Sequence, residues 1–257
     1  MLGAIAGDII GSVYEAHPIK STDFPLFTDQ STFTDDSVLT VAVAESILHG
    51  TDYATSFKKY YNLYPHAGYG LSFIRWASSD AREPYNSWGN GSAMRVSPVG
   101  FAFDTLEEVL HEARRSAEVT HNHPEGIKGA QATAAAVFLA RTGAGKKEIQ
   151  TYVRDTFGYP MDEPLDSIRE HYTFDISCQG TVPQAVSAFV ESENFEDAVR
   201  KAVSLGGDSD TLACITGGIA QACYGALPDF IIDRVYKVLD PALRRQVTLF
   251  CNRFACV

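Results

Sequence analysis

The chain has 257 residues, of which 45% are hydrophobic and 21% are charged, and its formal net charge is −11. This length allows one large core or two small ones, and the composition is that of an ordinary soluble globular protein. The negative charge without a Lys/Arg-rich stripe argues against a nucleic-acid groove, and no apolar run approaches the roughly 18 residues of a membrane span.

Apolar and small residues recur at helical spacing along almost the whole chain. The predicted helices are residues 2–16, 35–49, 52–63, 104–120, 124–142, 145–157, 182–192, 194–204, 209–225, 228–239 and 241–254. Only residues 171–177 (HYTFDIS) carry a strand pattern, and no strand alternates regularly with helices. The sequence therefore predicts an all-α fold, with a single domain over residues 1–257.

The first predicted helix carries two acids on one face. Asp8 and Glu15 are separated by about two turns, and the glycines at positions 3, 7 and 11 also share a face that permits close packing. Asp8 lies within an apolar run, so we expect it to be hydrogen-bonded or linked to a metal. Glu15 stands at the helix end, where both a solvated acid and a functional group fit.

Two acidic clusters each begin a later predicted helix. They are Thr34-Asp35-Asp36 and Asp208-Ser209-Asp210-Thr211, about 170 residues apart. Such residues are ordinary helix N-caps, and acids suit the first turn of a helix. However, one cap uses one side-chain oxygen, and each cluster supplies three or more. We therefore infer that the two helix starts meet in space.

If the two clusters meet, bound cations would be needed to keep their carboxylates ionised. Two carboxylates about 5 Å apart repel by roughly 3 kcal/mol at an effective dielectric of ~20. The donors are all hard oxygens, which favour Mg²⁺, Mn²⁺ or Ca²⁺ over Zn²⁺. The pattern indicates a two-metal hydrolase rather than a binding module.

Two further segments offer groups for a ligand. In NSWGNGSAMRVSPVG (86–100), Gly89 and Gly91 allow close backbone approach and Trp88 offers a stacking surface, although a plain turn fits equally well. In THNHPEGIKGA (120–130), His121 and His123 lack the partners of a zinc site. A hydrogen bond to substrate and a linker histidine both fit there.

The helix predicted over 209–225 is rich in small residues, including Gly217 and Gly218, so we place it at the centre of the bundle. The five cysteines form no CxxC pair and leave one over, which predicts neither disulfides nor zinc. The N-terminal segment lacks a basic region and Asp8 interrupts its apolar run, so no secretory signal is expected. We expect a cytoplasmic monomer.

These motifs together resemble one family. GAIAGDIIGSVYE, FTDDS, GNGSAMRVSPVG, THNHPEG and SLGGDSDT occur in the order and spacing of the ADP-ribosylglycohydrolases, from about residue 2 to residue 225. The resemblance implies an orthogonal helical bundle around two Mg²⁺ ions, with Mn²⁺ as the alternative. It implies hydrolysis of the N- or O-glycosidic bond between ADP-ribose and an acceptor on a protein, nucleic acid or small molecule, releasing ADP-ribose.

The resemblance also implies roles for individual residues. The implied metal ligands are Thr34, Asp35, Asp36, Asp208, Asp210 and Thr211, with Asp210 bridging both ions. Glu15 and Asp35 are the implied catalytic acids, either of which could help water attack the anomeric carbon. The implied lining of the diphosphate and ribose pocket is Ser87, Trp88, Gly89, Asn90, Gly91 and His121. The loops 17–33 and 66–86 are expected to select the acceptor.

Two other functions remain open on the sequence. Paired acids with Mg²⁺ also suit a nucleotide phosphohydrolase, which would release AMP or inorganic phosphate instead of ADP-ribose. A protein that binds ADP-ribose without catalysis is the second alternative. The complete set of acidic residues favours an enzyme.

Overall fold

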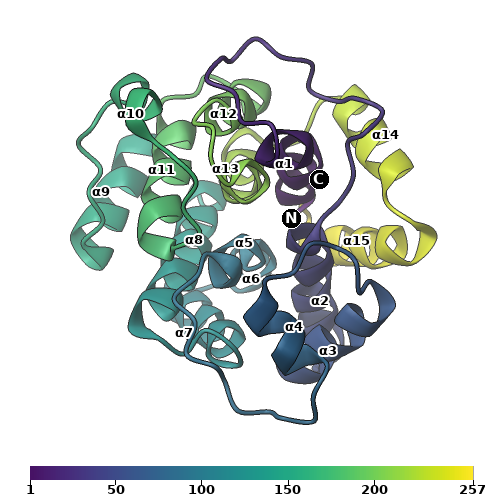
Figure 1. The fold of residues 1–257 in the computed structure, drawn as a ribbon. Helices are drawn as coiled ribbons and strands as arrows, with labels where there is room; N and C mark the ends of the chain where they lie inside the picture. Colours follow the sequence, from purple (N-terminus) through teal and green to yellow (C-terminus); the bar gives the residue numbers. More distant parts are fainter. Residues whose placement is uncertain (257) are drawn as a thin grey trace.

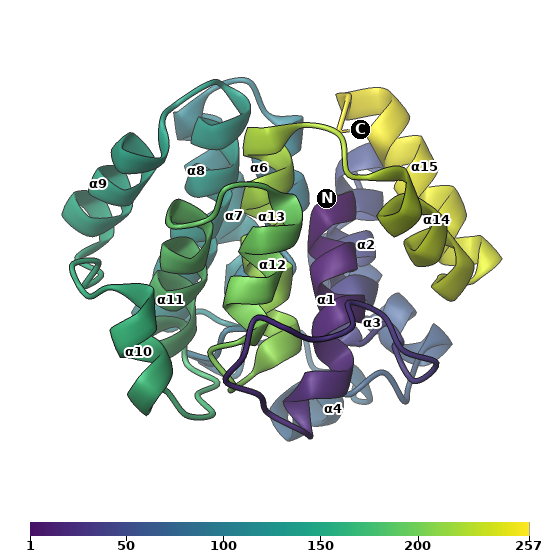
Figure 2. The same cartoon turned by 90° about the horizontal axis from the view of Figure 1, so that it is seen from above.

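The computed structural model describes residues 1–256, which form fifteen helices and no strand (Figures 1 and 2). The helices are α1 (Leu2–Glu15), α2 (Asp35–His49), α3 (Tyr53–Leu63), α4 (Leu71–Ala77), α5 (Gly91–Met94), α6 (Ser97–Ala102), α7 (Leu106–Glu118), α8 (Pro124–Arg141), α9 (Lys146–Phe157), α10 (Leu165–His171), α11 (Cys178–Val190), α12 (Phe195–Val203), α13 (Ser209–Tyr224), α14 (Asp229–Val238) and α15 (Pro241–Phe254). The all-α prediction is confirmed.

Residues 171–177, the one stretch with a strand pattern, form no strand. Its first residue ends α10, and the rest is irregular apart from one antiparallel bridge between Gly89 and Ser177. Two hydrogen bonds flank this bridge, from Asn90 N to Ile176 O at 2.7 Å and from Cys178 N to Trp88 O at 3.1 Å. The end of this segment therefore pairs with the glycine-rich segment 86–100, but the pairing is too short to form a sheet.

The sequence prediction also misses four short helices, α4, α5, α6 and α10, which have between four and seven residues. A helix of one or two turns shows too little apolar periodicity to be recognised, and its stability comes from tertiary packing. Helix α11 begins at Cys178 rather than at residue 182, because Ser177 caps it by accepting a hydrogen bond from Gly180 N.

The N-terminal helix α1 packs along α13 at the centre of the molecule (Figures 1 and 2). Glycine is required at this contact: a Cβ added at Gly7 would lie 2.0 Å from Ala213 O, and one at Gly11 would lie 2.4 Å from Ser209 O. Every residue of α13 from Ser209 to Gln221 is buried. This confirms the predicted central helix, and it brings the end of α1 beside the beginning of α13.

Helix α1 also holds the beginning of α2 through Asp8. The fully buried Asp8 carboxylate accepts hydrogen bonds from Thr34 N at 3.0 Å, Thr34 Oγ1 at 2.7 Å and Ser37 N at 3.0 Å, and also from the Ser37 hydroxyl. Asp8 is thus hydrogen-bonded, one of the two arrangements expected for it. One helix therefore positions both acidic clusters.

The last two helices of the chain pack against the first two. Helix α14 packs against α1 and α15 packs against α2, on the side of the molecule coloured yellow in Figure 1. The single domain expected over residues 1–257 stays a prediction, and Val257 lies outside the described residues. Among residues 1–256, no helix has the length and apolar character needed to cross a membrane.

Candidate active site

A cavity of about 520 Å³ opens where α1, α2 and α13 meet the glycine-rich segment. Twelve of the thirteen residues implied for the site line it. They are Glu15, Thr34, Asp35, Asp36, Ser87, Gly89, Asn90, Gly91, His121, Asp208, Asp210 and Thr211. The fold therefore brings together clusters that are far apart in the sequence.

Trp88 is the exception. Its side chain is 49% exposed and does not contribute to the lining of the cavity. Its backbone carbonyl is engaged by Cys178 N, within the bridge to the segment after α10. The stacking role implied for Trp88 therefore stays a prediction, and it concerns the outer surface next to the cavity.

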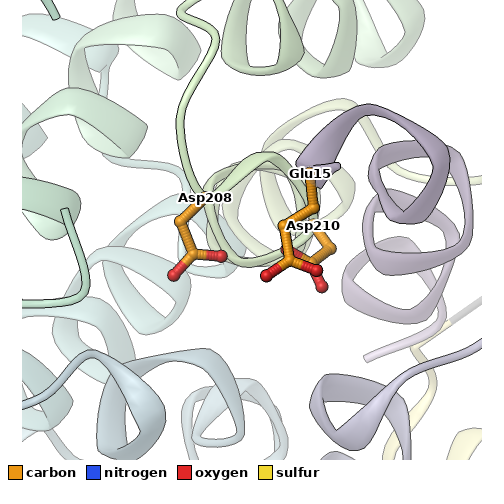
Figure 3. Close-up of side chains that lie close together, drawn as sticks. All are labelled: Glu15, Asp208 and Asp210. Carbon is orange, nitrogen blue, oxygen red and sulfur yellow. The ribbon is translucent and has the colours of Figure 1, made fainter. Parts of the chain in front are cut away.

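Three carboxylates from two helices converge at one end of the cavity (Figure 3). One oxygen each of Glu15, Asp208 and Asp210 lies within 4.8 Å of the others. Glu15 is the last residue of α1 and is exposed, whereas the two aspartates are buried. An acid is disfavoured at the C-terminal end of a helix, where the helix dipole is negative. Its position next to two more acids points to a functional role rather than a stabilising one.

The second group of acids comes from the start of α2. Asp36 is buried, and its Oδ2 accepts a hydrogen bond from the Thr211 hydroxyl at 3.3 Å. Its Oδ1 is buried without any partner among the described residues. An unsatisfied buried carboxylate oxygen is costly, and a cation is a natural partner for it. This orphaned oxygen fits the metal centre that the donor set implies.

The electrostatics of the cluster are those of crowded acids. Burial, followed by the charges of Asp8 and Asp208, raises the pKa of Asp35 to about 8. Burial and neighbouring carboxylates also raise the pKa values of Asp36 and Asp210 well above the ordinary value. Burial, then Asp208 and Asp8, raises the pKa of Glu15. The cluster therefore requires either protons or cations at neutral pH.

Helix capping accounts for only one of these side chains. Thr34 is the N-cap of α2 and accepts a hydrogen bond from Asp36 N at 3.3 Å. Asp208 occupies the same position on α13 but makes no capping bond; its Oδ2 instead accepts from Asn90 Nδ2 at 2.7 Å. Asp210 Oδ1 accepts from the adjacent Thr211 N at 3.0 Å, and the carboxylates of both helix starts line the cavity.

The opposite wall of the cavity carries hydrogen-bond donors. His121 is buried there, and burial followed by the charge of Arg95 lowers its pKa well below the ordinary value. Two amides of the glycine-rich segment are already used: Gly89 N donates to Ser87 Oγ at 3.2 Å and Asn90 N donates to Ile176 O. His123 is the N-cap of α8, where its ring accepts from Glu125 N, as in the linker interpretation.

Sequence reasoning missed several residues of the cavity. Arg95 and Tyr85 line the cavity together with His121. Three exposed apolar residues also line it, namely Leu71, Phe174 and Ile176. Arg95 could have been noticed as a lone charge within the apolar run AMRVSPVG. The apolar residues belong to irregular segments or short helices, and no local pattern marks them.

Known proteins match the chain over most of its length. A family model described as ADP-ribosylglycohydrolase matches residues 1–255. ADP-ribosylhydrolase ARH3 of Mus musculus is 27% identical over 88% of this chain and 82% of its own length. ADP-ribosylarginine hydrolase Tri1 of Pseudomonas putida is also 27% identical, over 88% of this chain and 69% of its own length.

The fold is also similar to that of a solved structure whose name refers to the same family. A chain of an ADP-ribosylglycohydrolase-related protein complex has a TM-score of 0.73 and 25% sequence identity. The similarity covers 99% of this chain and 96% of that chain. The similarity therefore includes the helices that form the cavity.

Proposed function

This chain belongs to the ADP-ribosylglycohydrolase family and is a hydrolase of glycosidic bonds to ADP-ribose, and we propose that it works with two divalent cations, Mg²⁺ or Mn²⁺. The proposal is carried by one observation, the convergence of acids from α1, α2 and α13 at one end of a cavity. The donor set consists of hard oxygens, as these cations prefer.

The cations would be held by side chains from both helix starts. The proposed ligands are Thr34, Asp35, Asp36, Asp208, Asp210 and Thr211. Asp210 would be the ligand shared by both ions, a role supported by the charges of Asp36 and Asp208, one from each helix start, which both raise its pKa. When bound, the two cations supply Lewis acidity at the ribose hydroxyls and offset the negative charge of the cluster.

One acid of the cluster would also take a proton from the attacking water. Hydrolysis forms a bond from a water oxygen to the anomeric carbon and breaks the bond to the acceptor, which leaves with the electron pair. Glu15 would accept the water proton, a role supported by its exposure and by its position within 4.8 Å of Asp208 and Asp210. Asp35, also on the cavity wall, is the alternative acid for this step.

The remainder of ADP-ribose would lie toward the glycine-rich wall. Ser87, Gly89, Asn90, Gly91 and His121 line this part of the cavity and offer hydroxyl, amide and imidazole groups. Asn90 joins the two parts, because its amide donates to Asp208 on the acidic side. Trp88 would contribute at the outer edge, where its indole is available for stacking on the adenine.

The acceptor would be a group on an ADP-ribosylated protein or a small molecule. The loop 66–86 contributes Gly68, Gly70 and Tyr85 to the cavity wall, and a second hollow of about 340 Å³ continues from Glu15 past Pro18 and Lys20. Both loops expected to select the acceptor thus lie next to the acids. Of the two relatives named above, both 27% identical to this chain, only Tri1 has a name that specifies an acceptor, which is arginine, so the linkage must be measured.

The test is release of free ADP-ribose from arginine-linked, serine-linked and nucleic-acid-linked substrates, followed by chromatography with Mg²⁺, Mn²⁺ or EDTA. Metal-dependent release from one class supports the proposal and identifies the acceptor. AMP or inorganic phosphate as the product would instead indicate a phosphohydrolase. Tight ADP-ribose binding without release from any substrate would indicate a binding protein. A Glu15→Gln variant that keeps full activity would exclude Glu15 as the group that accepts the proton.

A further inference from the structure

A buried arginine lies behind the donor wall of the cavity. Arg95 is fully buried, and its guanidinium lies over the Phe57 ring, 4.3 Å from the ring centroid. Its Nη2 donates to Ser116 O at 3.0 Å and to Thr120 Oγ1 at 2.8 Å. A guanidinium has only donors, so Thr120 Oγ1 must be the acceptor in this contact.

The same threonine contacts His121. Thr120 Oγ1 lies 2.8 Å from His121 Nδ1. Because the threonine oxygen already accepts from Arg95, its own hydrogen is free to point at Nδ1, which then accepts. A proton on Nδ1 would instead add a second donor to the oxygen that already accepts from the Arg95 guanidinium, and it would leave the threonine hydrogen without this acceptor.

The other ring nitrogen faces the cavity. A Cβ added at Gly91 would lie 3.2 Å from His121 Nε2, and one added at Gly89 would lie 3.8 Å from it. Gly126 packs closely against the base of the His121 side chain, since a Cβ added at Gly126 would lie 2.9 Å from His121 Cβ. Within residues 1–256, no protein hydrogen bond to Nε2 is formed. Nε2 is therefore available to a ligand.

We propose that Arg95 and Thr120 are positioning residues that hold His121 as the neutral tautomer with the proton on Nε2, so that the ring donates a hydrogen bond to a phosphate oxygen in the cavity. His121 would then favour a ligand oxygen as its partner, because Nε2 presents a hydrogen-bond donor to the cavity and not an acceptor. The tautomer follows from the protein contacts alone, whereas the identity of the ligand as the ADP-ribose diphosphate rests on the proposed function.

Burial and Arg95 also keep the ring neutral. Both lower the pKa of His121, and burial is the larger cause. A neutral imidazole keeps one acceptor nitrogen and one donor nitrogen, and the partner of the first decides which atom carries the proton. Arg95 thus acts twice, by its charge and by its hydrogen bond to Thr120.

The tautomer can be observed directly by ¹H–¹⁵N correlation spectroscopy of the ring nitrogens in the full chain labelled with ¹⁵N-histidine. The expected wild-type spectrum has an unprotonated Nδ1 and a protonated Nε2 for His121. A wild-type spectrum with the proton on Nδ1 would overturn the proposal without any variant. Thr120→Val, which removes the hydroxyl at similar size, is expected to give a mixture of tautomers, and Thr120→Ser is expected to keep the wild-type pattern.

Ligand binding provides the second readout. Thr120→Val is expected to raise the Kd for ADP-ribose by about tenfold, which is typical for loss of one hydrogen bond to a charged group, while Thr120→Ser stays within about twofold. An unchanged Kd in Thr120→Val, with a normal thermal unfolding curve, would contradict the positioning role. If wild-type protein shows the expected tautomer but binds no ADP-ribose, the proposed function fails while the tautomer assignment stands.

Discussion

The hydroxyl of Thr211 donates a hydrogen bond of 3.3 Å to Asp36 Oδ2, across 175 residues of sequence. It joins the beginning of α13 to the beginning of α2 at the floor of the cavity. The other oxygen of Asp36 is left without a protein partner. A contact that satisfies one oxygen of a buried carboxylate leaves the other oxygen for a cation.

Asp210→Asn is expected to reduce kcat/KM by more than about 100-fold. Mutation of residues that only support a metal ligand typically lowers metal affinity or activity by about 10- to 100-fold, and loss of a ligand should cost more. The amide keeps the size of the side chain but removes its charge from a buried position. The measurement is metal-dependent ADP-ribose release, with Asp104→Asn as the control at an exposed acid. Full activity in Asp210→Asn would exclude Asp210 as the bridging ligand.

Divalent cations are expected to raise the unfolding temperature, and the rise should increase with pH. In the metal-free fold the pKa of Asp35 is raised from 3.8 to about 8, so the contribution of this group to stability is largest at low pH and is lost as pH increases through that interval. Cations bind the ionised carboxylates and offset this loss. At a concentration of 100 times Kd, the stabilisation is about 2.7 kcal/mol, or about 5 to 10 °C for a chain of this size.

The measurement is the difference in Tm between Mg²⁺ and EDTA at pH 5.5 and at pH 8. Taking the difference at each pH removes the contribution of groups that do not bind the metal. Equal differences at the two pH values would contradict the link between metal binding and the raised carboxylate pKa values.

Gly11→Ala is expected to reduce both metal-induced stabilisation and activity. The added Cβ would lie 2.4 Å from Ser209 O and 2.6 Å from Asp210 Cα, so α1 must move away from the beginning of α13. Overpacking of this kind costs about 1–3 kcal/mol. Gly145→Ala is the matched control, because its φ of −71° is ordinary and no atom lies within 4 Å of the added Cβ.

The comparison for this pair is calorimetric titration of Mg²⁺ together with thermal unfolding. Gly145→Ala should keep the wild-type metal affinity, and its loss of stability should be limited to that of alanine at the N-cap of α9, where glycine is preferred. If Gly11→Ala loses stability but keeps wild-type metal affinity, the contact between α1 and α13 does not set the geometry of the acids.

Asp8→Asn is expected to lower the free energy of unfolding by about 1–3 kcal/mol, the usual cost of disturbing buried hydrogen bonds. The Asp8 carboxylate accepts hydrogen bonds from the backbone and side chains of Thr34 and Ser37, and an amide nitrogen cannot accept any of them. Urea denaturation measures the change. A stability equal to that of the wild type would show that Asp8 does not hold the beginning of α2 in place.

The long helices and several residues of the site can be predicted from local sequence. The long helices appear as apolar residues at regular spacing, because a helix of three or more turns buries a continuous face. The acidic helix starts at Asp35 and Asp208 were identified since each has more carboxylates than a cap uses. Asp8 and the glycines of α1 also carried visible signals: a charge in an apolar run and a spacing of four residues.

The sequence by itself determined the all-α class, the family and the acids that could form a metal site, because these depend on residue type and short-range spacing. Only the tertiary structure decided which groups meet: Glu15 with Asp210, Thr211 with Asp36, and Arg95 with His121 through Thr120. It also placed Trp88 outside the cavity wall. Such contacts arise from packing between distant segments, and no local pattern of propensity or periodicity encodes the distance between two side chains far apart in the chain.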